Sequence, residues 1–196
     1  MEKITSFIYH SPVGELMLAS FDGRLCLCDW EAGRSREVVR RRLERRLGAR
    51  FEAGTKPVIE LAARQLDEYF DGRRREFNVP LLFAGTDFQC AVWETLMTIP
   101  YGTTISYSDM AARMGMPRAV RAVAGANRVN AISVIVPCHR VIGANGALTG
   151  YGGGLDVKEA LIAAELGIHS AIGLTETPMP LPPSPRGFTS PELNCR

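Results

Sequence analysis

The stretch IVPCHRVIGANG places a cysteine and a histidine side by side, at Cys138 and His139. Pro137 stands directly before them and closes an apolar run, so the thiol lies where a buried segment gives way to a loop. A cysteine alone would most often be a small buried apolar side chain. Here His139 and Arg140 follow directly, and cations near a thiol lower its pKa and favour the nucleophilic thiolate. The pattern therefore predicts a reactive cysteine.

The histidine needs a relay and a partner if it is to act as a base. Adjacent residues on an extended segment point to opposite sides, so we expect His139 to reach the thiol through a bridging water. A third group must hold the imidazole tautomer. Glu165 is the candidate, because it shares one side of a predicted helix, residues 156–167, with Leu161 and Ile162, and a carboxylate among aliphatic side chains is usually paired. A partly exposed glutamate near the helix end is the alternative interpretation.

A glycine-rich stretch, GALTGYGGGLD at residues 146–156, lies between these groups and contains one aromatic residue, Tyr151. It matches neither a P-loop nor a dinucleotide-binding fingerprint. A merely flexible loop is one interpretation. The functional interpretation is a pocket wall beside the thiol, with backbone N–H groups free to bind a substrate.

The hydrophobic pattern predicts the elements that position these groups. The first thirty residues contain three apolar-rich runs separated by turn signals, which is typical of a β-meander. Two helices follow, at residues 35–47 and 57–70; the second is opened by Pro57 and ended at Gly72. Residues 75–86 are predicted to form a strand and a linker.

The second half is predicted to be mainly helical. A helix at residues 87–99 has Asp87 as its N-cap, and a short helix capped by Ser106 follows it. The next helix, residues 118–128, has Pro117 at its first position. Two short helices joined by a glycine-containing turn are a helix-turn-helix candidate.

The segment before the cysteine, residues 131–137, is β-branched and is predicted to be a short buried strand. The predicted fold class is therefore α+β. A small sheet-and-helix domain occupies residues 1–84, and a mainly helical domain with a helix-turn-helix and the active-site strand occupies residues 85–170. Residues 171–196 hold six of the twelve prolines and no apolar periodicity, which predicts a disordered tail.

One side of the helix at residues 118–128 interleaves arginine with the smallest residues. At 100° per residue this side carries Arg118, Arg121, Ala122, Gly125 and Arg128, and the opposite side carries Val120, Val123 and Asn127. A mid-helix glycine costs about 1 kcal/mol relative to alanine, and a solvated surface gains nothing from it. Small residues between cations let a backbone approach phosphates closely, so nucleic-acid contact is favoured over a solvated helix face.

The charge balance limits how a nucleic acid can be bound. The net charge is only +2 over 196 residues, which excludes a wholly basic coat. A second basic stretch, from Arg34 to Arg50, is interpreted as a helix with a solvated arginine-rich outer face, and no role is assigned to it. No apolar stretch reaches eighteen residues and the N-terminus lacks a signal-peptide pattern, so we expect a cytoplasmic protein without a membrane span.

The five cysteines fit the same compartment. Their number is odd and their spacing matches no disulfide framework. Cys26 and Cys28 share one face of an alternating strand and have no second ligand pair, so they are interpreted as small buried side chains rather than metal ligands.

With these residues assembled, the chain resembles the methylated-DNA–protein-cysteine methyltransferases, also called O6-alkylguanine-DNA alkyltransferases. The most specific match is PCHRV, residues 137–141, and the resemblance runs from residue 87 to residue 166 with FQCAVWETLMTIPYGTTISYSDMA, RAVRAVAGANR and GYGGGLDVKEALIAAEL in the family's order. Residues 1–84 are similar to the family's smaller, more variable domain.

The resemblance implies a role for each matching residue. Cys138 would be the acceptor thiol that attacks the alkyl carbon on the guanine oxygen, with His139 as a base acting through water and Glu165 orienting it. Tyr107 matches the tyrosine that rotates the damaged nucleotide out of the duplex and hydrogen-bonds its base. Arg121 matches the arginine that fills the vacated stack.

Further matches concern the pocket. Asn130 corresponds to a hinge asparagine between the recognition helix and the active-site strand, although Ala131 replaces the proline that many relatives carry next. The backbone carbonyls of Cys138 and Val141 would read the exocyclic amine of the base, and Tyr151 would form the pocket wall.

The resemblance also implies partners. The recognition helix would enter the minor groove, which suits Ala122 and Gly125, while Gly152 replaces a serine of some members at a contact made largely by backbone. The expected partner is double-stranded DNA containing O6-alkylguanine, with O4-alkylthymine as a second candidate lesion. A monomer without cofactor or membrane contact is expected. No metal is expected either, because the zinc ligands of some animal members have no clear counterpart.

The expected activity is DNA repair by irreversible, stoichiometric methyl transfer with base flipping, because nothing in the site would hydrolyse the thioether. Two alternatives stay open. A helix-turn-helix protein could bind alkylated DNA without chemistry, or Cys138, His139 and Glu165 could form a cysteine hydrolase. The hydrolase is disfavoured because adjacent cysteine and histidine are badly placed for direct proton transfer and no oxyanion motif is evident.

Overall fold

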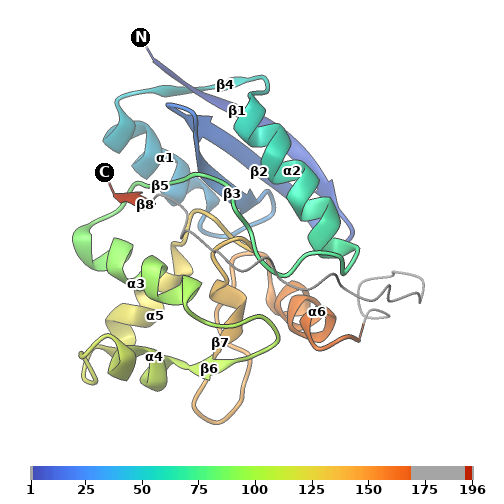
Figure 1. Ribbon diagram of the computed structural model, residues 1–196. Helices are drawn as coiled ribbons and strands as arrows, with labels where there is room; N and C mark the ends of the chain where they lie inside the picture. Colours follow the sequence, from blue (N-terminus) through green and yellow to red (C-terminus); the bar gives the residue numbers. More distant parts are fainter. Residues whose placement is uncertain (1, 169–192, 196) are drawn as a thin grey trace.

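The computed structural model describes residues 2–168 and 193–195 (Figure 1). Its strands are β1 Lys3–Ser11, β2 Gly14–Phe21, β3 Arg24–Trp30, β4 Arg50–Ala53, β5 Leu81–Phe83, β6 Ile105–Ser106, β7 Val141–Ile142 and β8 Leu193–Cys195. Its α-helices are α1 Arg36–Leu47, α2 Pro57–Phe70, α3 Asp87–Met97, α4 Tyr107–Arg113, α5 Val120–Arg128 and α6 Leu155–Glu165, and a 3-10 helix covers Cys138–Arg140. The predicted α+β class is confirmed.

The first half is built on a sheet with the strand order β4-β1-β2-β3-β5-β8. The meander β1-β2-β3 is antiparallel, as predicted, and β4, β5 and β8 add in parallel to its two sides. Helix α2 lies along β1 and β2, and the helices of the second half gather below the sheet in the view of Figure 1. No helix in the described part of the chain is long and apolar enough to cross a bilayer.

The second half places two short helices against each other. Helix α5 packs on both α3 and α4, which gives the predicted helix-turn-helix arrangement. Ser106 caps α4 through a capping box with Asp109, as predicted. Strands β6 and β7 pair in parallel, and this pairing joins the start of α4 to the residues that follow Cys138.

Three predicted details of the second half are wrong. Residues 131–137 do not form a strand: they turn, with a single bridge from Ile132 to Cys28, and Val134 has a positive φ of 70°. Helix α5 begins at Val120, because residues 117 and 118 are used in the turn before it. Helix α3 is capped by Thr86 rather than Asp87, since the Thr86 hydroxyl accepts from the backbone N–H of Gln89.

The cysteines are also not all reduced. Cys90 of α3 and Cys195 of β8 form a disulfide, because β8 pairs beside β5 and returns the end of the chain to the start of α3. Residues 171–192 and 196 of the predicted tail lie outside the described residues, and 193–195 form β8. Cys26 and Cys28 are buried apolar side chains, as expected.

The arginine-rich face of α1 is not wholly solvated. Arg42 is only 8% exposed, and its Nη1 donates to the carbonyl of Val129, just after α5, at 2.9 Å. Its guanidinium stacks over Trp93 at 5.0 Å from the ring centroid, and the Trp93 indole N–H donates to the carbonyl of Ala126. These contacts therefore hold the first and second halves of the chain together at the end of α5.

The packing of Trp93 generates a prediction about stability. A methyl group added at Gly85 would lie 2.5 Å from the Trp93 ring. We expect Gly85→Ala to lower the free energy of unfolding by about 1–3 kcal/mol, the range typical of overpacking. Urea denaturation measures the change. Gly125→Ala is the comparison variant and should not be destabilised, because no atom lies within 4 Å of its added methyl group. Equal unfolding midpoints for Gly85→Ala and the unmodified protein would contradict this packing.

Candidate active site

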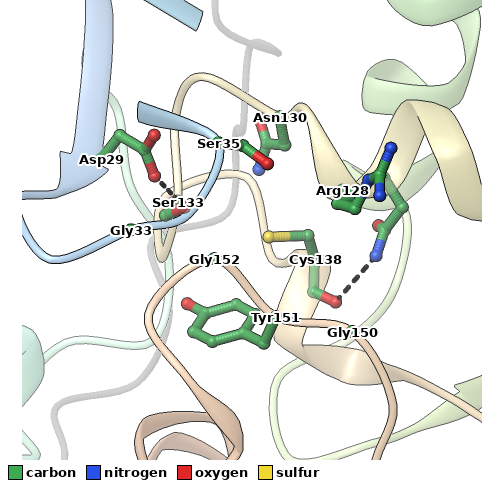
Figure 2. Close-up of a pocket in the computed structure, with 11 residues that line it drawn as sticks. Asp29, Gly33, Ser35, Arg128, Asn130, Ser133, Cys138, Gly150, Tyr151 and Gly152 are labelled. Atoms are coloured by element: carbon green, nitrogen blue, oxygen red, sulfur yellow. Dashed lines mark hydrogen bonds between the residues drawn. The ribbon is translucent and has the colours of Figure 1, made fainter. Parts of the chain in front are cut away.

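Cys138 lines a small pocket between the two halves of the chain (Figure 2). One wall comes from the end of β3 and the loop after it, a second from the end of α5 and the segment that follows, and a third from the glycine-rich loop. These walls are formed by Asp29, Gly33 and Ser35, by Asn127, Arg128, Asn130 and Ser133, and by Gly150, Tyr151 and Gly152. The enclosed space is about 10 Å³, room for roughly one water molecule.

The thiol itself is 4% exposed. Burial raises the pKa of Cys138 to about 11, because the thiolate is poorly solvated there. Hydrogen bonds from Asn130 and Ser133 and the charge of Lys158 act in the opposite direction but are outweighed. The expectation that its two sequence neighbours lower this pKa is wrong. The chain turns into a 3-10 helix at Cys138, and the next two side chains are directed to Glu165 instead.

His139 is held by Glu165, as predicted. The two side chains are fully buried or nearly so, and His139 Nε2 lies 2.7 Å from Glu165 Oε1. Burial lowers the pKa of His139, so the imidazole is neutral at pH 7. An ionised carboxylate can only accept, so Nε2 carries the proton and Nδ1 carries the lone pair. Nδ1 is buried and has no hydrogen-bond partner among the described residues, which leaves it free to accept a proton.

Glu165 has more partners than the sequence indicates. Arg140 donates to both of its oxygens at 2.9 Å, Tyr69 donates its hydroxyl at 2.8 Å, and the backbone N–H of Gly102 donates at 3.0 Å. Burial alone would raise the pKa of Glu165, but the hydrogen bonds from His139 and Arg140 and the positive charge of Arg140 hold it well below its usual range. Because His139 is neutral, the permanent positive charge at this carboxylate is that of Arg140.

Tyr107 stands at the start of α4 and is bound to a residue that the sequence analysis did not assign to the site. The Nδ2 of Asn127 donates to the Tyr107 hydroxyl oxygen at 3.2 Å and, weakly, to the Cys138 carbonyl at 3.4 Å. Asn127 is 3% exposed, and its Oδ1 has no partner in the described structure. The available signal was an asparagine on the apolar side of an amphipathic helix.

Asn130 holds the turn that leads to the thiol. Its Nδ2 donates to the carbonyl of Val136 at 3.0 Å, and its Oδ1 accepts from the backbone N–H of Ile132 at 3.0 Å. These two bonds hold residues 131–137 in a turn. Asn130, which was predicted to be a hinge, therefore binds the backbone at two points of this turn.

The glycine-rich loop closes the pocket. Tyr151 accepts a hydrogen bond from the Trp30 indole at 3.2 Å, and its ring stands edge-on to His139. Gly152 lies against Asp29: a methyl group added there would lie 3.6 Å from Asp29 Oδ1. The predicted pocket residues are thus brought together with the thiol, although two of their partners belong to the first half of the chain.

Lys158 is a further buried group that the sequence analysis missed. Its Nζ donates to the carbonyls of Val141 and Thr149 at 2.6 and 2.8 Å, which ties the glycine-rich loop to the strand after the cysteine. Burial lowers the pKa of Lys158 to about 8. The signal was its spacing, because Lys158, Leu161 and Glu165 share one face of α6.

The face predicted to contact nucleic acid is exposed and continuous with the pocket. Its exposed members are Arg118, Arg121, Ala122, Gly125 and Arg128, of which Arg128 also lines the pocket. Val123 and Asn127 are buried on the opposite side. A methyl group at Gly125 would have no atom within 4 Å, so the glycine is not required by packing inside the protein.

Comparison with known proteins agrees with this arrangement. Residues 5–83 match the family model described as 6-O-methylguanine DNA methyltransferase, ribonuclease-like domain, and residues 87–167 match the DNA-binding domain of the same family. The methylated-DNA–protein-cysteine methyltransferase of Methanosarcina barkeri is 43% identical over 81% of this chain and 94% of the relative.

Solved structures show the same similarity. The chain matches Mycobacterium tuberculosis OGT in complex with DNA at 40% identity and a TM-score of 0.72, over 87% of this chain and 99% of that one. An O6-methylguanine-DNA methyltransferase from Pyrococcus kodakaraensis has a TM-score of 0.60 at 21% identity, over 85% and 98% of the two chains, and supports the fold alone.

The contacts of Glu165 generate a prediction about stability and its pH dependence. Glu165→Gln leaves Arg140 buried without its counter-charge, so we expect a loss of about 3–5 kcal/mol in the free energy of unfolding near pH 7. Because the pKa of Glu165 is lowered in the folded state, the stability that its carboxylate contributes is fully present above its ordinary pKa of 4.5. This stability is lost progressively as the pH falls below 4.5.

Urea denaturation of both proteins between pH 7 and pH 3 measures the effect, and the difference between them should shrink toward low pH. Glu159→Gln, an exposed change on the same helix, should stay within about 0.5 kcal/mol of the unmodified protein. A difference at Glu165 that does not change with pH would contradict the assignment.

Proposed function

The chain belongs to the 6-O-methylguanine DNA methyltransferase family, and from that premise we propose that it transfers the alkyl group from O6 of guanine in DNA to its own Cys138, once per molecule. DNA repair by alkyl transfer, with DNA as the partner, is the activity that its relatives establish. One observation carries the finer proposal: a buried thiol is followed directly by a neutral imidazole whose Nδ1 has no hydrogen-bond partner among the residues that the structure describes.

The proton of the thiol leaves through the histidine. His139 Nδ1 takes the Cys138 proton through one bridging water, while Nε2 keeps its bond to Glu165. Because burial keeps Cys138 protonated near pH 7, the thiolate forms only as the reaction proceeds. Glu165 stabilises the imidazolium that results.

The group transfer is an in-line displacement. The Cys138 sulfur forms a bond to the alkyl carbon, the bond from that carbon to O6 breaks, and the electron pair stays on the purine oxygen. A hydrogen-bond donor to the purine favours its departure. The product is a thioether, which no described group of this site would hydrolyse, so each molecule acts once.

The damaged base reaches the thiol only after it leaves the duplex, since its O6 is otherwise buried in the stack. We assign the rotation of the nucleotide to Tyr107 and the filling of the gap to Arg121, which is exposed on the DNA-facing side of α5. Asn127 donates to the Tyr107 oxygen, so the Tyr107 hydroxyl proton is left for the base.

The backbone carbonyls of Cys138 and Val141 are proposed to read the exocyclic amine. The Val141 carbonyl accepts one side-chain hydrogen bond, from Lys158, and has a second lone pair for the amine. The Cys138 carbonyl accepts from the Val141 backbone N–H and weakly from Asn127, so the amine would take the place of the weak Asn127 bond. Asn130 braces the turn that presents these carbonyls, and Tyr151 and Gly152 form the facing wall.

Several finer points stay predictions: the domain division near residue 84, the monomeric state, the cytoplasmic location and activity on O4-alkylthymine. A protein that binds alkylated DNA without chemistry is the alternative function. It differs in one outcome, because such a protein would keep all function in Cys138→Ala.

The proposed transfer generates a stoichiometric prediction. When the protein is mixed with a duplex that carries one O6-methylguanine, the peptide containing Cys138 should gain the mass of one methyl group, and repair should stop at one lesion per protein. Mass spectrometry of the digested protein measures the gain. Cys138→Ala should bind the duplex and repair none of it; continued repair beyond equimolar lesion, or repair with an unmodified peptide, would refute the proposal.

The DNA-facing side of α5 generates a second prediction. Gly125→Ala should raise the free energy of unfolding by about 1 kcal/mol, because alanine favours a helix and nothing blocks the methyl group. If α5 lies in the minor groove, the same methyl group should weaken binding to duplex DNA severalfold. Urea denaturation and a fluorescence binding titration measure the two effects. A stabilised variant with undiminished DNA affinity would place the DNA contact elsewhere.

A further inference from the structure

Asp29 is a buried acid that the proposed transfer does not use. It lies near the end of β3 in the first half of the chain, is 6% exposed, and lines the pocket that holds Cys138. A buried carboxylate is costly unless it is paired. Asp29 forms no ion pair with any described residue; the charge of Arg42 on α1 lowers its pKa only across space. Its position therefore calls for a role in the pocket.

The carboxylate lies on the side of the pocket toward which the sulfur points. In Figure 2 the Cys138 sulfur points away from Arg128 and toward the side formed by Ser133, Gly152 and Asp29. The Ser133 hydroxyl donates to Asp29 Oδ1 at 3.3 Å, and the same hydroxyl also interacts with the thiol. The negative charge of Asp29 reaches the sulfur as well, because it contributes to the raised pKa of Cys138.

An alkyl group bound to the sulfur must share this space. Resting on the proposed function, we propose that Asp29 and Ser133 form the wall beside which the alkyl group is received, and that the Asp29 carboxylate selects neutral alkyl groups against anionic ones such as carboxymethyl. The favoured substrates are then O6-methylguanine and other lesions with small neutral substituents.

The selection follows from charge and burial. Two negative groups a few ångströms apart in a poorly solvated pocket repel strongly, and no water can enter between them once the substituent fills the space. The cation that lines the pocket, Arg128, is exposed and lies on the other side of the sulfur in Figure 2. Lys158, the other cation whose charge reaches the sulfur, does not line this pocket and is bound to the carbonyls of Val141 and Thr149. The charge that an anionic substituent meets on the wall of the pocket is therefore that of Asp29.

The charge on Asp29 changes near neutral pH. Burial raises the pKa of Asp29 to about 7, while the Trp30 backbone N–H, the Ser133 hydroxyl and the charge of Arg42 lower it, and Glu31 raises it. Asp29 is thus ionised above about pH 7 and neutral below it. Its other ionisable neighbours, Cys28, Cys138 and Tyr151, all have pKa values raised by burial and are neutral over this range. Burial lowers the pKa of Lys158, whose charge reaches the sulfur, to about 8, so only the pH dependence that Asp29→Asn removes is assigned to Asp29.

The test compares two substituents of nearly equal size. The full chain is mixed with duplexes that carry O6-carboxymethylguanine or its neutral isostere O6-carbamoylmethylguanine, and the rate at which the Cys138 peptide gains each group is measured between pH 6 and pH 8.5. At pH 8 the carboxymethyl group should be transferred at least tenfold more slowly, and the ratio of the two rates should approach one toward pH 6. Both substrates use the same thiol and histidine, so the titration of those groups cancels in the ratio.

Asp29→Asn should raise the carboxymethyl rate at least tenfold relative to the carbamoylmethyl rate and remove the pH dependence of the ratio. Glu15→Gln, which removes an exposed acid from the neighbouring strand β2, should leave the ratio unchanged. O6-methylguanine serves as the reference substrate for every variant. The pH series of the unmodified protein tests the inference even if Asp29→Asn does not fold.

Three outcomes would overturn the inference: equal rates for the two isosteres at pH 8, a ratio unaffected by Asp29→Asn, or the same change of ratio in Glu15→Gln. In each case methyl transfer to Cys138 would still support the proposed function. Absence of methyl transfer in the unmodified protein would instead refute the proposed function. The proposed selection of neutral alkyl groups by Asp29 would then be refuted as well.

Discussion

The requirement to satisfy one buried carboxylate organises the whole site. Glu165 accepts hydrogen bonds from the hydroxyl of Tyr69, the backbone N–H of Gly102, the imidazole of His139 and two nitrogens of Arg140. These donors come from α2, from the loop after α3 and from the 3-10 helix at the thiol. A buried charge that loses such partners costs several kcal/mol, so the segments must assemble together or not at all.

This assembly explains why the thiol can be both protected and usable. Burial keeps Cys138 protonated and His139 neutral, so the resting site holds no exposed thiolate that could react with unrelated electrophiles. The Glu165 bond leaves His139 with its lone pair on Nδ1, which has no hydrogen-bond partner in the described part of the chain. The proposed reactivity of Cys138 therefore depends on the positions of His139 and Glu165 rather than on a permanently lowered pKa of the thiol.

The first half of the chain contributes directly to the site instead of serving only as a support. Tyr69 binds Glu165, Trp30 holds Tyr151, and Asp29 lines the pocket. Arg42 reaches across to the end of α5, where its guanidinium also stacks over Trp93. Changes in the first half of the chain can therefore alter the pocket that holds Cys138.

The sequence alone predicted the contact between His139 and Glu165, the helix-turn-helix arrangement and the exposed arginine-bearing side of α5, because these depend on local periodicity, caps and adjacent residue types. It could not reveal Tyr69, Asp29, Asn127 or Lys158 as parts of the site, since their roles arise from contacts between distant segments. It also misjudged residues 131–137, whose β-branched composition favours a strand but whose backbone groups are bound by Asn130 and β3. The protonation states of Cys138 and His139 were likewise decided by the tertiary structure. The solvation of a side chain depends on every group packed around it, and its neighbours in sequence are only a few of those groups.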